Sequence, residues 1–189
     1  AITVSDDSAL QTPPTRRSAD YDGAISIKDK THKRRSGVRG ITANSWLKLQ
    51  NLVTPDAPNR IILADNNTWV MSLSTREYWL LEPHEDADTF PMGRDFSEDG
   101  VYPLFCQSSH CWFVIAGDAK AQMMAKLCGV DLRSENFESG AVAQTQLALV
   151  NCIIARHTID DEDVFSVFID QSLAEYTLEV LLDAREEFL

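Results

Sequence analysis

The C-terminal half of this sequence alternates strand-like and helix-like apolar patterns, and this order restricts the folds open to the chain. An apolar run at residues 110–115 is followed by Gly117, and a helical pattern then covers residues 118–128. Strand patterns return afterwards, and the chain closes with a second helical pattern over residues 172–188. We therefore predict an α+β lobe in which helices lie on one face of a mainly antiparallel sheet.

Three strands are expected between the two helices. They lie at residues 141–150, 151–156 and 164–169, with a charged turn at residues 160–163 before the last of them. The final helix has a capping box, because Glu175 follows Ser172 by three residues. Its predicted buried stripe consists of Leu173, Tyr176, Val180, Leu181 and Ala184. In the earlier helix the shared face contains Ala121, Met124, Ala125 and Cys128.

The preceding part of the chain indicates a second small sheet. Strand patterns occupy residues 60–64, 68–73 and 77–81, and in the second of these Trp69, Met71 and Leu73 share one face. Residues 82–100 combine acidic residues, Pro and Gly without a period, which is typical of a connection. We therefore divide the body into an N-terminal α+β lobe at residues 39–100 and a C-terminal α+β lobe at residues 101–189.

The formal charge of −12 is unevenly distributed along the 189 residues. Residues 1–40 carry eight Lys or Arg and five Asp or Glu, whereas the rest carry nine and twenty-four. Residues 28–39 are strongly basic with few apolar side chains, and residues 1–22 are rich in Ser, Thr, Asp and Pro. We expect residues 1–38 to form an extended basic arm. It could be a solvated tail, a strap on an acidic partner surface or, least favoured, an arm for nucleic acid.

Membrane insertion, export and nonspecific nucleic-acid binding are disfavoured by the composition. The longest uninterrupted apolar run is only residues 111–116, far short of the ~20 residues that a helical membrane span needs. No basic start leads into an apolar stretch, so we expect a cytoplasmic protein. The acidic body also opposes binding to phosphate backbones, which depends on Lys and Arg.

The usual sequence signs of a catalytic or cofactor site are missing. The eight glycines are too scattered to form a phosphate-binding loop, and the four cysteines contain no CxxC pair. A metal site at Cys106, His110 and Cys111 is disfavoured because neighbours on a strand point to opposite faces. The same divergence disfavours a nucleophile formed by residues 108–110. We therefore assign no catalytic, cofactor-binding or metal residues to this chain.

Several other positions have two possible roles. Residues 160–163 lack the ligand spacing of a calcium loop, which favours a solvated turn. Trp46 is expected in the core, with an exposed partner-binding anchor as the alternative. Gly140 and residues 144–145 either shape the edge of the sheet or face a partner, and we favour the structural role.

The order of several short motifs resembles the gamma subunit of heterotetrameric sarcosine oxidase. In that family a strand ends in a Gly turn, a helix closes on Cys before Asp-Leu, and Ala-Gln-Thr and Arg-ended strands follow. A Ser-x-Ala-x-Tyr helix then ends in Asp-Ala-x-x-Glu-Phe. The matching positions here are residues 77–81, 111–119, 127–132, 143–145, 171–176 and 182–188, with Phe137, Gly140 and Arg156. The resemblance covers residues 69–189 and is weak over residues 1–60.

This resemblance implies a fold similar to the folate-binding domain of the glycine-cleavage T-protein. It also implies a non-catalytic subunit of a complex that oxidatively demethylates N-methyl amino acids and transfers one carbon to tetrahydrofolate. The expected partners are the alpha, beta and delta subunits, with alpha the most direct contact. The resemblance places FAD, FMN, NAD, tetrahydrofolate and zinc in those partners and none of them in this chain.

Three alternatives remain open. The chain could be the equivalent subunit of an N-methylglutamate dehydrogenase or of another N-methyl amine dehydrogenase. It could be a T-protein-like factor that still binds folate, with Arg156 facing the glutamate of the ligand. It could also be a free-standing regulatory or RNA-modification factor with the same fold.

Overall fold

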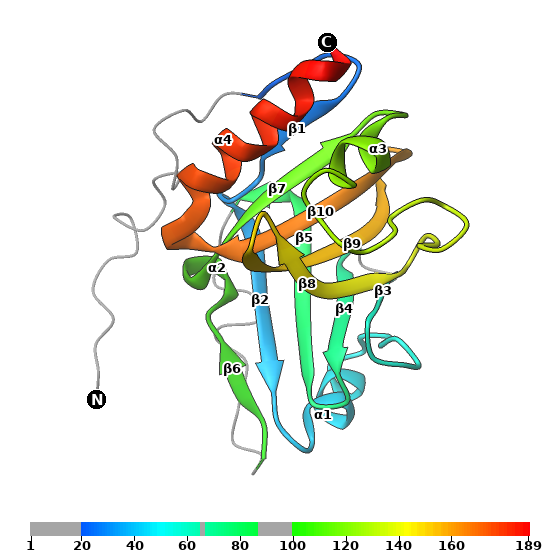
Figure 1. Ribbon diagram of the computed structural model, residues 1–189. Coiled ribbons are helices and arrows are strands. Elements are labelled where there is room, and N and C mark those ends of the chain that lie inside the picture. The colour runs from blue at the N-terminus through cyan, green and yellow to red at the C-terminus, as the bar shows by residue number, and fades with distance from the viewer. Residues whose placement is uncertain (1–19, 65–66, 87–99) are drawn as a thin grey trace.

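The computed structural model describes residues 20–64, 67–86 and 100–189, which build two five-stranded antiparallel sheets (Figure 1). The C-terminal sheet has the order β1 (Ser26–Asp29), β7 (His110–Ala116), β10 (Glu162–Asp170), β9 (Val150–Ile159) and β8 (Val142–Leu147). The N-terminal sheet has the order β3 (Arg60–Leu63), β4 (Trp69–Ser74), β5 (Glu77–Asp86), β2 (Lys33–Arg39) and β6 (Tyr102–Leu104). The predicted α+β class with two antiparallel sheets is confirmed.

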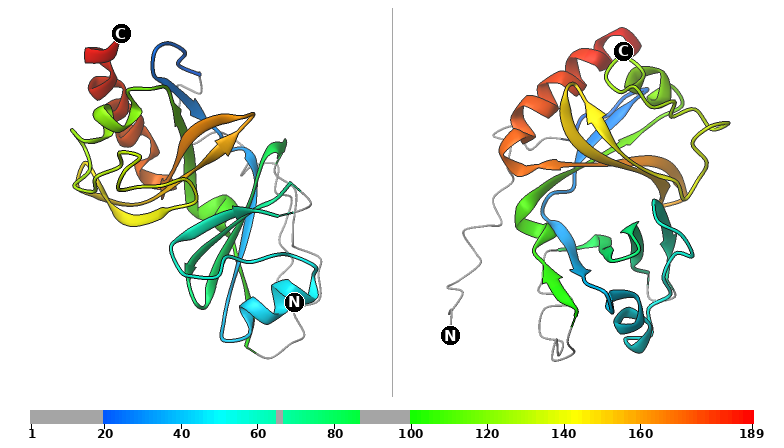
Figure 2. Two further views of the ribbon diagram at one scale, coloured as in Figure 1. Left: turned by 90° about the vertical axis from the view of Figure 1, so that its right-hand side faces the viewer. Right: turned by 60° about the horizontal axis from the view of Figure 1, so that its bottom comes forward.

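The helices lie outside the two sheets. Figure 2 shows α3 (Lys120–Met124) and α4 (Ala174–Arg185) on the side of the C-terminal sheet that faces away from the N-terminal sheet. At the opposite end of the molecule, α1 (Ala43–Leu49) packs on the N-terminal sheet, and the short α2 (Cys106–Ser109) leads from β6 into β7. Within the described residues, no helix combines the length and apolar character needed to cross a membrane.

Strand β7 shows how the sheets and helices share their cores. Its side chains alternate, so Cys111, Phe113 and Ile115 pack toward α3 and α4. Trp112 and Val114 point the other way, toward the N-terminal sheet. From that sheet the shared core receives Ile61, Met71, Leu73, Trp79 and Leu81. Because both faces of β7 are apolar and covered, the strand reads as an uninterrupted hydrophobic run in the sequence.

The outer face of the N-terminal sheet is covered by α1, which the sequence reasoning missed. Ala43, Trp46 and Leu47 follow helical spacing and are buried against Val38 and Leu80. A helix of seven residues is not stable alone, so this packing is what holds it. Trp46 is 1% exposed and therefore belongs to the core, as we favoured, and not to an exposed anchor.

Most strands predicted from alternation are present. The patterns at residues 60–64, 68–73 and 77–81 correspond to β3, β4 and β5, and Trp69, Met71 and Leu73 share the face toward the C-terminal sheet. The predicted Gly turn after β7 also forms. Gly117 has φ 113°, and a Cβ there would lie 2.2 Å from the carbonyl oxygen of Ala24, so only Gly fits.

The basic segment at residues 28–39 forms parts of two sheets, which corrects the expected extended arm over residues 20–38. β1 pairs with β7, and β2 pairs with both β5 and β6. Pairing is possible because individual charges are neutralised: Arg34 is bonded to Glu82, and Arg39 to Glu77. Residues 1–19 of the expected arm lie outside the described residues.

The sheets cross the expected division of the chain at residue 100. β1 belongs to the C-terminal sheet although it precedes every strand of the N-terminal sheet, and β6 joins the N-terminal sheet at residues 102–104. β5 also continues to Asp86, inside the stretch of residues 82–100 that we expected to be a connection. Residues 87–99 of that stretch lie outside the described residues.

The predicted buried stripe of the last helix is partly wrong. Asp170 accepts hydrogen bonds from the N–H and the hydroxyl of Ser172, and the 3₁₀ turn η2 (Gln171–Leu173) precedes α4. A second 3₁₀ turn, η3 (Glu186–Phe188), ends the chain. The tighter first turn rotates the helix, so Leu173 and Tyr176 are exposed. The residues that α4 buries are Ala174, Thr177, Leu178, Leu181, Ala184 and Arg185.

Arg35 of β2 joins the two sheets at the point where β2 lies against α2. Its side chain is buried and donates to the carbonyl oxygens of Thr31 (2.9 Å), Cys106 (3.3 Å), Gln107 (3.3 Å) and His110. Burial lowers the pKa of this guanidinium to about 10. A buried charge is tolerated only where its donors are satisfied, and here backbone carbonyls of both lobes satisfy them.

Replacing Arg35 by Leu should destabilise the protein by about 3 to 5 kcal/mol, because several buried carbonyl oxygens lose their donor. Arg35→Lys should be damaging as well, since one ammonium cannot reach carbonyls spread over the guanidinium fork. Arg39→Leu is the matched control on the same strand. Its side chain is 61% exposed, so its loss should cost below about 1 kcal/mol. Urea unfolding measures all three, and equal effects at positions 35 and 39 would contradict this role.

Candidate functional site

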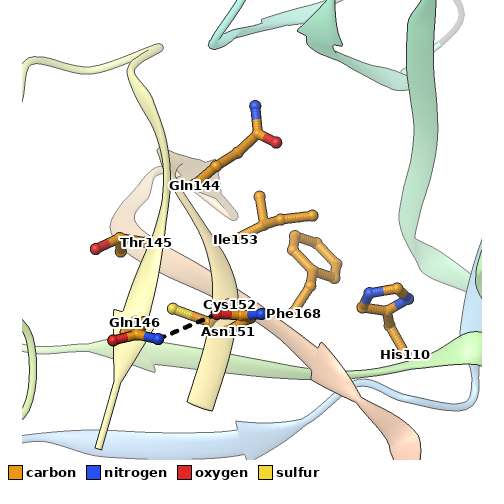
Figure 3. Close-up of a pocket in the computed structure, with 8 residues that line it drawn as sticks. All are labelled: His110, Gln144, Thr145, Gln146, Asn151, Cys152, Ile153 and Phe168. Carbon is orange, nitrogen blue, oxygen red and sulfur yellow. Dashed lines mark hydrogen bonds between the residues drawn. The ribbon is translucent and has the colours of Figure 1, made fainter. Parts of the chain in front are cut away.

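A groove of about 500 Å³ lies on the C-terminal sheet where β8 and β9 extend past the N-terminal sheet (Figure 3). Its apolar wall is formed by Ile153 and Phe168, both of which belong to the core between the sheets. Trp79 closes that wall, with its ring centroid 5.5 Å from Phe168 and 4.8 Å from His110. The lining residues are His110, Gln144, Thr145, Gln146, Asn151, Cys152, Ile153 and Phe168.

Most polar side chains of the groove are amides, and Thr145 and His110 add a hydroxyl and an imidazole. Gln144 donates to the carbonyl oxygen of Leu73 and to Asn59 Oδ1, both at 2.7 Å, so it connects β8 to the N-terminal sheet. Gln146 donates to Asn151 Oδ1 at 3.3 Å across the hairpin. Amides offer donors and acceptors without charge. The groove is therefore suited to an uncharged ligand surface that is polar or partly apolar, such as a peptide backbone.

His110 stands at one end of the groove and contacts its neighbour Ser109. The Ser109 Oγ lies 2.8 Å from His110 Nδ1, which corrects our expectation that these side chains diverge. Ser109 ends α2 and is not part of a strand, so strand alternation does not separate them. Burial and then the nearby Arg35 cation lower the pKa of His110, which leaves the imidazole neutral at pH 7.

The cysteines lie in packed surroundings. All four are buried free thiols, and Cys111 packs toward the helices while His110 faces Trp79, as alternation predicted. Burial raises the pKa of Cys106, Cys111 and Cys152 to about 12. Thiolate formation, on which nucleophilic and metal-binding cysteines depend, is therefore suppressed at these three positions.

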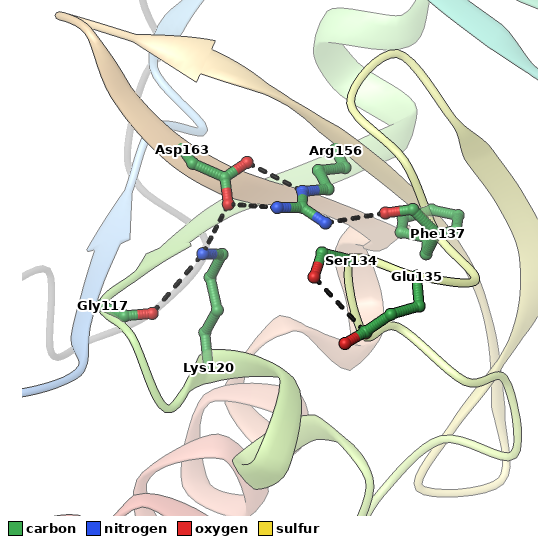
Figure 4. Close-up of polar contacts among 7 residues, drawn as sticks. All are labelled: Gly117, Lys120, Ser134, Glu135, Phe137, Arg156 and Asp163. Atoms are coloured by element: carbon green, nitrogen blue, oxygen red, sulfur yellow. Dashed lines mark hydrogen bonds and ion pairs between the residues drawn. The ribbon is translucent and has the colours of Figure 1, made fainter.

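Arg156 is held on the opposite, helix-facing side of the same sheet (Figure 4). Its Nε and Nη2 donate to the two carboxylate oxygens of Asp163 at 2.9 and 2.8 Å, and its Nη1 donates to the Phe137 carbonyl oxygen. Lys120 Nζ also reaches Asp163, at 2.8 Å. Burial raises the pKa of Asp163, but the hydrogen bonds from Arg156 and Lys120 outweigh it and hold that pKa below its usual value.

This arrangement bears on the folate alternative, in which Arg156 faces a glutamate carboxylate of the ligand. A carboxylate binds Arg best through two parallel N–H donors, and Asp163 already occupies that edge of the guanidinium. In this structure Arg156 therefore faces Asp163 and acts as a structural residue between β9 and β10.

The acidic turn at residues 160–163 is also structural. Asp160 and Asp161 are exposed and have φ of 53° and 63°, the left-handed region that Asp tolerates in a hairpin turn. The solvated turn that we favoured is therefore present at these two positions, whereas Asp163 faces Arg156. Among the described residues, no group of three or more His, Cys, Asp or Glu side chains could hold a metal ion.

His157 connects the sheets from inside the shared core. It is fully buried, its Nε2 lies 2.7 Å from Ser166 Oγ, and Ser166 Oγ accepts from Trp112 Nε1 at 2.9 Å. The Trp69 ring of the other sheet packs edge-on against the imidazole at 4.6 Å. Burial lowers the pKa of His157 to about 4, so the imidazole is neutral in the folded protein. His157 therefore has a structural role in the shared core.

The fold is similar to solved structures of two proteins. A chain of heterotetrameric sarcosine oxidase from Corynebacterium sp. U-96, solved with pyrrole 2-carboxylate, has a TM-score of 0.74 and 19% identity over 89% of this chain and 88% of that chain. Aminomethyltransferase T of the glycine cleavage system from Bartonella henselae has a TM-score of 0.61 and 14% identity, covering 82% of this chain. The chain has a T-protein-like fold.

The T-protein-like fold and the suspected resemblance to a sarcosine oxidase chain are thereby confirmed at the level of structure. This chain spans only 45% of the length of the aminomethyltransferase. No family model and no curated protein matches the sequence. At 19% and 14% identity the likeness concerns the fold, and residue roles do not transfer with it.

The groove amides were missed as site residues, although the sequence held a signal for them. Gln144 and Gln146 alternate along a strand and so share a face, and residues 141–155 contain no charged side chain. Of these positions, only residues 144–145 receive a role from the sequence, where they either shape the sheet edge or face a partner. The contact of Gln144 with Leu73 is a structural contact, and the groove beside it leaves room for a partner.

Charging of His157 should make the protein less stable in mild acid. The pKa is near 4 when folded and about 6.5 when unfolded, so stability is complete above pH 6.5 and falls as pH drops toward 4. The loss at pH 5 should be about 2 kcal/mol. His157→Phe should remove this component, whereas His84→Gln, at a half-exposed site, should keep it. Urea unfolding at pH 7 and 5 tests this, and an unchanged pH dependence in His157→Phe would contradict it.

Asp163→Asn should destabilise the protein by about 1 to 2 kcal/mol, because Arg156 and Lys120 would then lie together without their shared anion. Asp161→Asn is the matched control in the same turn. Asn is well suited to its positive φ, so this variant should be neutral or slightly more stable. Thermal unfolding at low salt measures both, and a neutral Asp163→Asn would exclude a structural role for the network.

Proposed function

We propose that this chain is a non-catalytic, gamma-type subunit of a multisubunit flavoprotein that oxidatively demethylates N-methyl amino acids. The observation that carries this proposal is the reciprocal coverage with a chain of heterotetrameric sarcosine oxidase, at 89% and 88% of the two lengths. Coverage this high on both sides supports a correspondence between the two chains over nearly all of the fold. In contrast, the aminomethyltransferase is more than twice as long as the region it shares.

The chemistry of the described residues is in keeping with a structural, non-catalytic subunit. Three of the four thiols have pKa values near 12, Arg156 is bound to Asp163, and His157 is bound to Ser166. A nucleophile or general base needs a pKa suited to its task and access to substrate. These groups instead stabilise the fold, and the proposal assigns FAD, FMN, NAD, tetrahydrofolate and zinc to partner subunits.

In this proposal the partners are alpha, beta and delta subunits in the cytoplasm, with alpha, the folate-binding large subunit, as the most direct contact. The subunit supports alpha in one-carbon transfer to tetrahydrofolate. An equivalent subunit of an N-methylglutamate or other N-methyl amine dehydrogenase has the same role with another substrate. The second candidate, a T-protein-like chain that binds folate itself, is favoured by the fold shared with the aminomethyltransferase.

Native mass spectrometry of the endogenous protein tests the assembly. The tagged chain should be recovered with larger chains that carry flavin absorbance, whereas the isolated chain should be colourless. Recovery as a monomer from the same cells would overturn the proposal in favour of a free-standing factor.

The same preparation separates the two candidates. In titration calorimetry with tetrahydrofolate, the isolated chain should give no binding heat and the flavin-bearing complex should give saturable heat. Saturable heat from the isolated chain would favour the folate-binding candidate.

A further inference from the structure

An exposed apolar surface lies at the tip of the β8–β9 hairpin, the end of η2 and the first turn of α4. Leu149 is 89% exposed, Tyr176 is 45% exposed and Leu173 is 36% exposed. The Tyr176 hydroxyl donates to the carbonyl oxygen of Ala148 at 3.0 Å, which holds the helix against the hairpin tip. We call Leu149, Leu173 and Tyr176 the hairpin patch.

The backbone at the hairpin tip favours residues other than those present. Ala148 and Leu149 form a two-residue turn with φ of 47° and 69°, between the paired residues Leu147 and Val150. Such turns favour Asn and Gly, because a side chain with a Cβ is disfavoured in the left-handed region. Leu149 is thus strained and almost fully exposed, and neither property benefits the isolated fold.

The hairpin also lacks the charges that usually protect a sheet edge. β8 is an edge strand of the C-terminal sheet, and residues 141–155 contain no Asp, Glu, Lys or Arg, although 24% of the chain is charged. Leu147 and Ala148 at one end of this edge pair with Cys128 and Leu127, and the Val142 N–H bonds to Asn59 at the other end. The open part of the edge is therefore limited to residues 143–146, where charged side chains would usually prevent association. The amide-lined groove with Gln146 and Asn151 begins beside the same tip. The hairpin tip therefore lies between the hairpin patch, on the helix side of the sheet, and the groove, which opens on the side of the N-terminal sheet.

The rim of the hairpin patch is acidic. Asp170, Glu175, Glu179 and Asp183 are all exposed, and residues 170–184 contain no Lys or Arg. Two copies of this chain meeting through the surface would bring these carboxylates close to their own counterparts, which disfavours self-association. A different protein with cationic side chains around an apolar contact is complementary to both features.

We propose that the hairpin patch and its groove form the surface through which this chain docks on a larger protein subunit, with Leu149 as the apolar anchor. The partner surface is apolar at its centre and basic at its rim, where Lys or Arg face Glu175 and Glu179. This inference rests on the proposed function and adds the surface that carries it. A buried apolar anchor surrounded by a polar rim is the usual arrangement of an interface hot spot.

The test uses the full-length tagged chain expressed in its source cells and recovered with its flavin-bearing partners. Leu149→Asn removes the anchor but fits the left-handed turn, so the variant chain should melt at an equal or slightly higher temperature. The flavin absorbance retained per tagged chain should nevertheless fall at least tenfold. Leu49→Asn, at a 66% exposed position on α1 at the far end of the molecule, is the matched control and should retain the partner.

The charge on the rim is tested separately. Glu175→Lys with Glu179→Lys should lower the salt concentration at which the complex dissociates, whereas Asp56→Lys, at an exposed site in the distant loop before β3, should not. A complex that forms and is insensitive to Leu149→Asn and to the rim variants overturns the docking surface but leaves the proposed function intact. Recovery without any larger partner, or as a homodimer that Leu149→Asn dissociates, overturns both.

Discussion

The buried guanidinium of Arg35 is the contact on which the arrangement of the two sheets depends. It lies in β2 of the N-terminal sheet, yet its donors end on carbonyl oxygens of α2 and of the first residue of β7 in the C-terminal sheet. Gln107 adds two hydrogen bonds to the same region, one from the Arg35 N–H and one to the Thr31 carbonyl oxygen. These hydrogen bonds fix the start of β7 relative to β2. From that point the alternating side chains of β7 contribute to the core under the helices on one face and to the core between the sheets on the other.

Because β7 contributes to both cores, both faces of the C-terminal sheet are largely covered by other elements. On the helix side, α3 and α4 cover Phe113 and Ile115. Next to them Asp163 accepts hydrogen bonds from Lys120 and Arg156. On the other side the N-terminal sheet covers Trp112 and Val114 but not the far ends of β8 and β9. The groove exists because the N-terminal sheet does not extend over that hairpin, so it opens at the margin of the core between the sheets, next to Trp79.

How much of this was visible in the sequence depended on how locally each element is determined. The strands with alternating apolar residues were predicted, because the period is set by each strand itself. β2 was missed because its burial depends on carbonyl oxygens about 70 residues away, around Arg35. The stripe of α4 was misplaced because the 3₁₀ turn before it shifts the helical phase at Leu173. Among candidate site residues, the Ser109 and His110 contact depended on a four-residue helix that no pattern indicated.

Several polar groups inside this fold bind one another, and this bears on where its function lies. In a ligand site, preorganised polar groups remain available to the ligand, whereas here Arg156 is matched by Asp163 and the Ser166 hydroxyl by His157 and Trp112. These internal hydrogen bonds join neighbouring strands and the two sheets, and so make this part of the fold rigid. Rigidity benefits a docking surface, because little conformational freedom is lost on binding. A strained Leu149 is compatible with this role, since a partner that covers the side chain offsets the exposure that the isolated chain must tolerate.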